Sequence, residues 1–209
     1  MGKSFKTIDT AVIRFAGDSG DGMQLTGGRF TETTAIVGND LSTLPDFPAE
    51  IRAPAGSLAG VSAFQLKFSS KDIHTPGDKP DVLVAMNPAA LKVHQKDLIP
   101  GGTIIANTDA FSKKNLNFAG YDTNPLEDGS LDDYFTVIPI DMNKMVKAAC
   151  DDLDLNGKLV LRTKNFFALG VLFYMYDRPM DATEQWLKKK FAGKDDIIEA
   201  NKRAMNTGY

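Results

Sequence analysis

The sequence has 209 residues, of which 43% are hydrophobic and 24% charged, and its formal net charge is −3. A chain of this length and composition can bury about 70% of its unfolded surface on folding. The acidic balance argues against nucleic acid as a main partner, because the run Lys188-Lys189-Lys190 is typical of a solvated helix surface. The longest apolar stretch, residues 166–176, is too short to span a bilayer, so we expect a cytoplasmic protein without membrane contact.

Strand and helix patterns alternate along the chain. Strands are predicted at residues 12–15, 41–44, 61–68, 81–86, 103–107 and 136–140. Helices are predicted at residues 23–37, 89–97 and 143–152. This order predicts an α/β, Rossmann-like fold with a mostly parallel sheet and helices on both faces. Residues 141–209 are helical in pattern, with Asp181 and Asp195 expected as helix caps and Gly208 as the residue just past a helix end. We therefore expect a single domain over 1–209 with this helical portion packed on it.

The first predicted strand runs directly into a glycine-rich turn, residues 17–22, called the glycine turn below. Glycines let ligand oxygens approach the main chain, and the following helix presents unpaired N–H groups and a partial positive charge. The turn therefore favours a phosphate site. Its candidate binding residues are Gly17, Asp18, Ser19, Gly20, Asp21, Gly22, Met23 and Gln24.

A second interpretation of the same turn is close packing of the helix on the sheet. Met23, Gly27, Phe30, Thr34 and Val37 recur at spacings of four and three, which places Gly27 on the predicted buried face. The packing and binding interpretations are compatible.

The glycine spacing differs from the common nucleotide motifs. Gly17-x-x-Gly20-x-Gly22 reverses the dinucleotide order, and Gly27 is followed by Gly28-Arg29 where a P-loop has Lys and Ser or Thr. An NAD(P)-dependent reductase is therefore disfavoured but stays an alternative. Gly20-Asp21-Gly22 also looks like the opening of a thiamine diphosphate motif, yet the chain contains no Asn-Asn pair. Asp18 and Asp21 are expected to accept backbone N–H bonds rather than to hold Mg²⁺, and no metal site is predicted.

Two further strand ends carry polar residues. Asn87 follows the fourth predicted strand, and Asn107 ends the fifth. Because the carboxyl ends of parallel strands share one edge, these side chains are expected to converge with the glycine turn. Each asparagine is either a helix cap and turn residue or a hydrogen-bond partner for a ligand.

The chain has one cysteine, Cys150. A single cysteine excludes an intrachain disulfide and any all-cysteine cluster built from this chain alone. Cys150 lies in an amphipathic segment and is expected to be a packing residue. No catalytic residue is predicted.

Residues 45–62, called the proline-rich loop below, are too rich in Pro and Gly for a helix. A loop of this length inside a compact domain is usually functional. Arg52 supplies a planar fork suited to phosphate or carboxylate, and Glu50 either holds Arg52 or faces a neighbouring subunit.

These two segments carry a family resemblance. The glycine turn, with Phe47-Pro-Ala-Glu-Ile-Arg-Ala-Pro-Ala-Gly56 and Val61-Ser-Ala-Phe-Gln65, closely resembles the gamma domain of 2-oxoacid:ferredoxin oxidoreductases. The nearest type is the 2-oxoglutarate alpha subunit that begins with this domain. The resemblance covers essentially the whole chain. Since such a subunit continues far past Tyr209, the chain is expected to be a domain, a truncated product or a separately encoded subunit.

The resemblance implies a complex that decarboxylates a 2-oxoacid, reduces ferredoxin and delivers the acyl group to coenzyme A. It implies that this chain binds coenzyme A and is inactive in isolation. Thiamine diphosphate, Mg²⁺ and iron–sulfur clusters are then expected on partner alpha and beta subunits. A non-catalytic scaffold role within the complex is the alternative hypothesis.

Overall fold

The computed structural model describes residues 6–50, 53–77 and 79–209, and this part of the chain folds around a six-stranded sheet with the order β2-β3-β1-β4-β5-β6. The strands are β1 (Thr10–Asp18), β2 (Asp40–Asp46), β3 (Val61–Ser69), β4 (Val82–Ala85), β5 (Thr103–Asn107) and β6 (Thr136–Ile140). Every predicted strand is confirmed in kind and place. Apolar runs bounded by turn residues were a sufficient signal for them.

The sheet is mixed. β1, β4, β5 and β6 pair in parallel, whereas β3 pairs antiparallel with both β1 and β2. Among the described strands β3 alone therefore runs against the others, which confirms a mostly parallel sheet. Asp18 pairs with Val61 and Asp46 with Ala63, so the proline-rich loop begins and ends at the edge where β1 ends. The glycine turn and the proline-rich loop thus lie at the same edge of the sheet.

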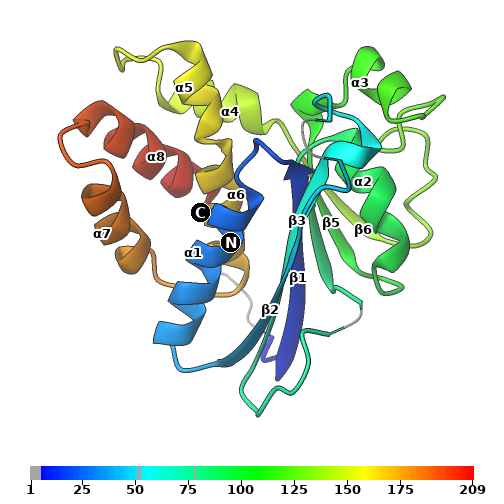
Figure 1. Ribbon diagram of the computed structural model, residues 1–209, viewed down its shortest axis with the longest axis horizontal. Coiled ribbons are helices and arrows are strands. Elements are labelled where there is room, and N and C mark those ends of the chain that lie inside the picture. The colour runs from blue at the N-terminus through cyan, green and yellow to red at the C-terminus, as the bar shows by residue number, and fades with distance from the viewer. Residues whose placement is uncertain (1–5, 51–52, 78) are drawn as a thin grey trace.

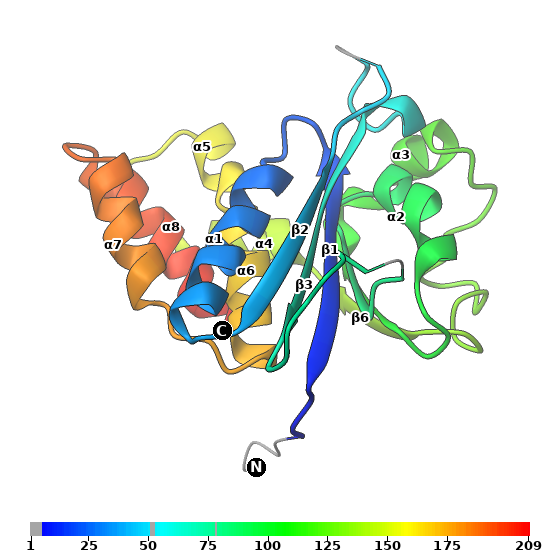
Figure 2. The same ribbon diagram turned by 60° about the horizontal axis from the view of Figure 1, so that its bottom comes forward.

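The helices form a layer on each face of the sheet (Figures 1 and 2). The helices are α1 (Met23–Ile36), α2 (Pro88–His94), α3 (Lys113–Phe118), α4 (Met142–Ala149), α5 (Gly157–Arg162), α6 (Lys164–Met175), α7 (Asp181–Lys190) and α8 (Asp195–Gly208). Short 3-10 turns are η1 (Leu58–Gly60), η2 (Gln95–Asp97) and η3 (Thr108–Ala110). α1 and α4–α8 cover one face, called the α1 face, and α2 and α3 cover the other, called the α2 face.

The sequence patterns missed two helices and misplaced three boundaries. α3 and α5 have only six residues each, which is too short for a periodic signal. Val37 was expected to be buried but is 47% exposed, because α1 ends at Ile36 and Gly38 turns the chain at φ 92°. Asp181 and Asp195 were expected as helix caps but lie in the first turns of α7 and α8. There, their negative charges interact favourably with the positive ends of the helix dipoles.

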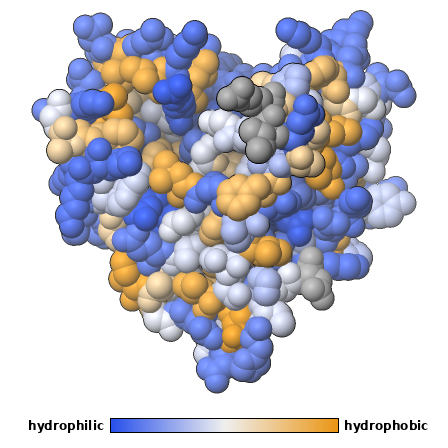
Figure 3. Space-filling view, in the orientation of Figure 1, coloured by the Kyte–Doolittle hydropathy of each residue, from blue (hydrophilic) through white to orange (hydrophobic). Residues whose placement is uncertain are grey.

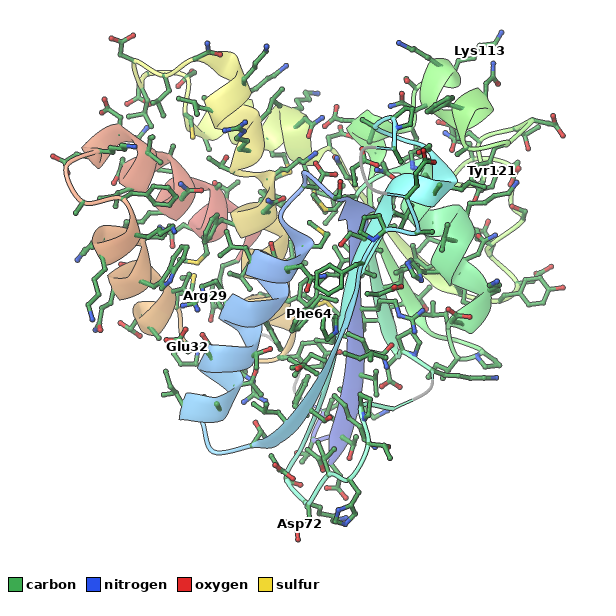
Figure 4. All side chains as sticks on the ribbon, viewed as in Figure 1. Arg29, Glu32, Phe64, Asp72, Lys113 and Tyr121 are labelled. Carbon is green, nitrogen blue, oxygen red and sulfur yellow. The ribbon has the colours of Figure 1, made fainter. Side chains whose placement is uncertain are left out.

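Close backbone approach builds the α1 face. A Cβ atom on Gly27 would lie 2.1 Å from the Phe64 ring, so Gly27 is on the buried face, as predicted. Phe64 projects from β3 toward α1 in Figure 4. α6 and α8 touch still more closely: a Cβ on Gly170 would lie 2.0 Å from the Met205 carbonyl oxygen, and one on Gly208 2.1 Å from that of Phe167. Gly208 was expected just past a helix end but belongs to this helix crossing.

The α2 face combines small side chains with a polar network. Ala85, Ala89, Ala90 and Ala106 are fully buried there. Below them Arg14 donates from Nε and Nη2 to the Gln65 side-chain oxygen at 3.0 and 2.7 Å and from Nη1 to Asp97 at 2.5 Å. Its Nη1 also lies 3.1 Å from His94 Nδ1. Gln65 and His94 are only 2% and 4% exposed, whereas the Asp97 side chain is 38% exposed, so the network runs from the interior to the surface.

Candidate binding site at the carboxyl edge of the sheet

The glycine turn connects β1 directly to α1. Gly22 is the N-cap of α1 at φ 74° and ψ 30°, a left-handed conformation that favours glycine, and no side chain caps the helix. A Cβ on Gly17 would approach Asp21 Oδ2 and Met86 Cβ to 3.1 Å, so this glycine brings the turn close to the end of β4. A Cβ on Gly20 would meet nothing within 4 Å. Local backbone geometry therefore requires Gly22, packing favours Gly17, and Gly20 faces open space.

The two carboxylates of the turn accept backbone N–H bonds, as predicted. Asp21 Oδ2 accepts from the Asp18 N–H at 3.2 Å, and the Asp21 N–H donates to the Asp18 carbonyl at 2.8 Å. Asp18 Oδ1 accepts from the Gly56 N–H at 3.0 Å, which ties the glycine turn to the proline-rich loop. The Ser19 N–H donates to the Gly60 carbonyl at 3.2 Å and adds a second tie.

The remaining N–H groups at the turn and the start of α1 lack an acceptor within the described residues. Within the described residues, the N–H groups of Gly20, Gly22, Met23 and Gln24 donate to no acceptor. The first intrahelical bond of α1 runs from the Thr26 N–H to the Gly22 carbonyl at 3.0 Å. Unpaired donors at a helix N terminus, together with the helix dipole, attract phosphate groups.

Burial raises the pKa of Asp18 above its usual value, and the nearby charge of Asp21 acts in the same direction. Hydrogen bonds from the Gly56 N–H and the Asn87 side chain, and the charge of Lys164, oppose this increase. The net result is that the negative charge at Asp18 is disfavoured.

Asn87 and Asn107 lie at the ends of β4 and β5, on the sheet edge where β1 ends, and the Asn87 side chain hydrogen-bonds to Asp18 of the glycine turn. Asn87 caps α2, because its Oδ1 accepts from the Ala90 N–H at 2.8 Å. Asn107 is fully buried and its Nδ2 donates to the Met86 carbonyl at 3.3 Å. The Asn107 Oδ1 is buried and has no donor among the described residues. Asn87 is thus a cap, whereas Asn107 keeps one unused acceptor.

The other predicted site residues play different parts. Gln24 donates from Nε2 to the Ala63 carbonyl at 2.8 Å, so its side chain holds α1 to β3 while its N–H stays free. Met23 is buried, whereas Ser19 and Glu50 are exposed. The Glu50 N–H donates to the Ala59 carbonyl at 3.2 Å and folds the proline-rich loop on itself. Arg52 lies outside the described residues.

Helix α6 also contributes to this site, and the sequence did not predict this contribution. Lys164 places Nζ 2.9 Å from Asp21 Oδ1, and the Asn165 side-chain N–H donates to the Asp21 carbonyl. A Cβ on Gly22 would lie 2.8 Å from Asn165 Nδ2, so Gly22 also makes room for this contact. The adjacent polar pair Lys164-Asn165 at the start of an apolar helix was the available signal. Its partner, more than 140 residues away, could not be read from the sequence.

The described residues contain no group of three or more His, Cys, Asp or Glu side chains placed to hold a metal ion. Cys150 is 2% exposed and packs with its Sγ 3.8 Å from the Ala200 carbonyl, which confirms it as a packing residue. Burial raises the pKa of the Cys150 thiol, so the thiolate is disfavoured. No described helix is long and apolar enough to cross a membrane.

Comparison with known proteins places this geometry in a family. Residues 12–209 match the family described as pyruvate ferredoxin/flavodoxin oxidoreductase. The 2-oxoglutarate oxidoreductase subunit KorA of Mycobacterium tuberculosis is 53% identical over 202 residues, which cover 97% of this chain and 31% of that protein. The chain therefore spans about a third of the length of this curated relative.

Solved structures share the fold. The 2-oxoglutarate:ferredoxin oxidoreductase of Magnetococcus marinus, solved with 2-oxoglutarate, coenzyme A and succinyl-CoA bound, superposes with a TM-score of 0.73 at 24% identity over 97% of this chain and 31% of its own. The keto/oxoacid ferredoxin oxidoreductase gamma subunit of Geobacter sulfurreducens gives a TM-score of 0.65 at 18% identity and covers 96% of this chain and 95% of its own. The α/β fold predicted from the sequence is thereby confirmed, and the chain belongs to the pyruvate ferredoxin/flavodoxin oxidoreductase family.

Proposed function

We propose that this chain is the coenzyme A-binding part of a 2-oxoglutarate:ferredoxin oxidoreductase. The observation that carries the proposal is the set of N–H groups at Gly20, Gly22, Met23 and Gln24, which have no acceptor among the described residues and lie at the start of α1. Coenzyme A carries a diphosphate that suits such donors. The KorA relative supports the enzyme class, and the Magnetococcus protein of the same fold was solved with coenzyme A bound.

The role of the chain in this proposal is to bind and orient. The diphosphate is held by main-chain amides, and the pantetheine arm runs along the sheet edge toward the proline-rich loop, so that its thiol reaches an acyl group held by a partner. In this proposal no side chain of the glycine turn acts as a base for the thiol. The chain positions a nucleophile and does not activate one, which accounts for the expected inactivity of the isolated chain.

The remaining chemistry belongs to partners in this proposal. Thiamine diphosphate with Mg²⁺ and the iron–sulfur clusters lie on thiamine-binding alpha and beta subunits, and ferredoxin is reached through them. The single cysteine and the absence of a metal-ligating group in the described residues do not fit any of these cofactors. In this proposal the chain therefore contributes carrier binding alone.

Isothermal titration of the chain with coenzyme A tests the proposal, with Gly20→Leu as the informative variant. The Gly20 position is open in the structure, so the substitution leaves the fold intact while a side chain blocks ligand approach. We expect an affinity loss of about tenfold or more. Gly28→Leu is the matched control, because Gly28 also faces open space but lies farther along α1. No heat with coenzyme A, or equal affinity of the two variants, would contradict the proposal.

Arg52 provides a second, sequence-based test. We expect Arg52→Ala to weaken coenzyme A binding more than it lowers the melting temperature. An unchanged affinity removes Arg52 from the site. Titration with NAD(P)H is expected to give no heat, and measurable binding would favour the reductase alternative.

A scaffold role is the second candidate function, and an exposed apolar group favours it. Phe47 is 70% exposed, and Leu44, Leu58 and Phe118 are 47%, 45% and 52% exposed. Phe118 lies beside Gly56 of the proline-rich loop. These side chains suit contact with a partner subunit, and Phe47→Ser is expected to reduce co-purification with alpha and beta subunits.

A further inference from the structure

A basic recess adjoins the glycine turn on the α1 face. It has a volume of about 200 Å³ and is lined by Lys158, Arg162 and Lys164 together with Gly20, Asp21 and Asn165. The Asp21 carboxylate is paired with Lys164 at 2.9 Å. Lys158 and Arg162 are exposed and form no ion pair with any residue that the structure describes. The recess therefore keeps an excess of positive charge from these two side chains.

A larger, mostly apolar cavity lies next to this recess. Its volume is about 440 Å³, and its apolar wall includes Leu25, Leu155, Leu159, Phe166 and Phe191. Gly20, Arg162 and Asn165 line both the cavity and the recess, so the two spaces adjoin each other and the glycine turn. In Figure 3 hydrophobic surface lies among hydrophilic side chains over α5 and beside α8.

The two spaces match the two chemical parts of an adenosine 3′-phosphate. A phosphate monoester carries up to two negative charges and binds best to guanidinium and ammonium groups that have no other partner. A purine ring binds in apolar cavities lined by leucine and aromatic side chains. In coenzyme A these parts are joined to the diphosphate, which the glycine turn binds in the proposed function.

We propose that the adenosine end of coenzyme A binds between the glycine turn and helices α5 and α6, with its 3′-phosphate on Lys158 and Arg162 and its adenine in the apolar cavity. This inference rests on the proposed function and extends it to a specificity site. It assigns to Lys158 and Arg162 the discrimination between coenzyme A and carriers that lack the 3′-phosphate.

The test compares coenzyme A with 3′-dephospho-coenzyme A by isothermal titration of the whole chain. The variant is the double substitution Lys158→Gln and Arg162→Gln, and the control is Lys189→Gln with Lys190→Gln on exposed positions of α7, which makes the same change in net charge. The wild-type chain and the control should prefer coenzyme A by about tenfold. The double variant should lose this preference by binding coenzyme A less tightly while its affinity for the dephospho form stays the same.

Each outcome is decisive for one of the two proposals. If the double variant keeps the full preference, or if the wild-type chain shows none, the 3′-phosphate site is wrong while the proposed function stands. If the wild-type chain binds neither compound, the proposed function fails and this inference fails with it. Thermal unfolding of both variants checks that the fold is retained.

Discussion

The two faces of the sheet are packed by different means. On the α1 face, glycines bring backbones together, as Gly170 does at the Met205 carbonyl. On the α2 face, alanines fill the space above a buried network centred on Arg14. The α1 face also carries the recess and cavity beside the glycine turn. We infer that the α1 face is sensitive to added volume, whereas the α2 face is sensitive to lost hydrogen bonds and to pH.

The largest effect is expected from added volume where α6 crosses α8. Gly170→Ala places a Cβ 2.0 Å from the Met205 carbonyl oxygen, which is backbone and cannot rotate away. The helices must separate, and we expect a loss of about 3 kcal/mol in the free energy of unfolding, measured by urea denaturation.

Gly157→Ala is the matched control for this substitution. Gly157 begins α5, and its Cβ would meet nothing within 4 Å. Alanine there should be neutral or stabilising by about 0.5–1 kcal/mol. Equal effects of the two substitutions would show that the helix crossing is not tightly packed.

On the α2 face, Arg14→Met should cost about 2 kcal/mol in the free energy of unfolding. The substitution keeps the side-chain stem but leaves the buried Gln65 oxygen and the Asp97 carboxylate without their donor. Lys71→Met removes an ion pair with Asp9 whose side chains are 72% and 62% exposed, so it should change stability by less than about 0.5 kcal/mol. If Lys71→Met lowers the free energy of unfolding as much as Arg14→Met does, burial does not explain the contribution of the Arg14 network.

His94 gives the α2 face a pH dependence. Burial and the adjacent Arg14 charge lower the pKa of His94 below its usual value of 6.5, so the folded state keeps the ring neutral while the unfolded state takes up a proton. The stabilisation is complete above pH 6.5 and is lost as the pH falls below it. In urea denaturation at pH 7 and pH 5, the stability advantage of the wild type over His94→Asn should shrink at pH 5. An advantage that stays constant or grows would show that the ring is protonated in the fold.

The sequence predicted the positions of the strands better than their directions in the sheet. The predicted bounds of β5 and β6 match the observed ones, because each is a short apolar run between turn residues. The reversed direction of β3 was not visible, since alternation alone does not set direction. Gly208 shows the same limit: a glycine near a chain end fits both a helix stop and a helix crossing, and only the position of Phe167 distinguishes them.

In the candidate site, too, some features were predicted from the sequence and others were not. The glycine turn, the N–H-accepting role of Asp18 and Asp21 and the cap at Asn87 follow from neighbouring residues and were predicted. The walls that α5 and α6 contribute were not predicted, because Lys164 contacts Asp21 only through the packing of α6 against α1. Local chemistry was therefore readable, whereas contacts across the fold required the structure.

The smallest effect is expected at Asp18, where the glycine turn meets the proline-rich loop. Asp18→Asn keeps an oxygen to accept the Gly56 N–H bond but removes a charge that burial already disfavours. An anion on the neighbouring N–H groups then meets less repulsion, so the affinity for coenzyme A should rise by about threefold at low salt and by less in 0.5 M salt, where charges are screened. Asp133→Asn, an exposed change of the same charge at a distance, should leave the affinity unchanged. Equal titration curves for wild type and Asp18→Asn at low salt would mean that the anion binds away from the turn, and the α1 face would lose its assigned role in binding.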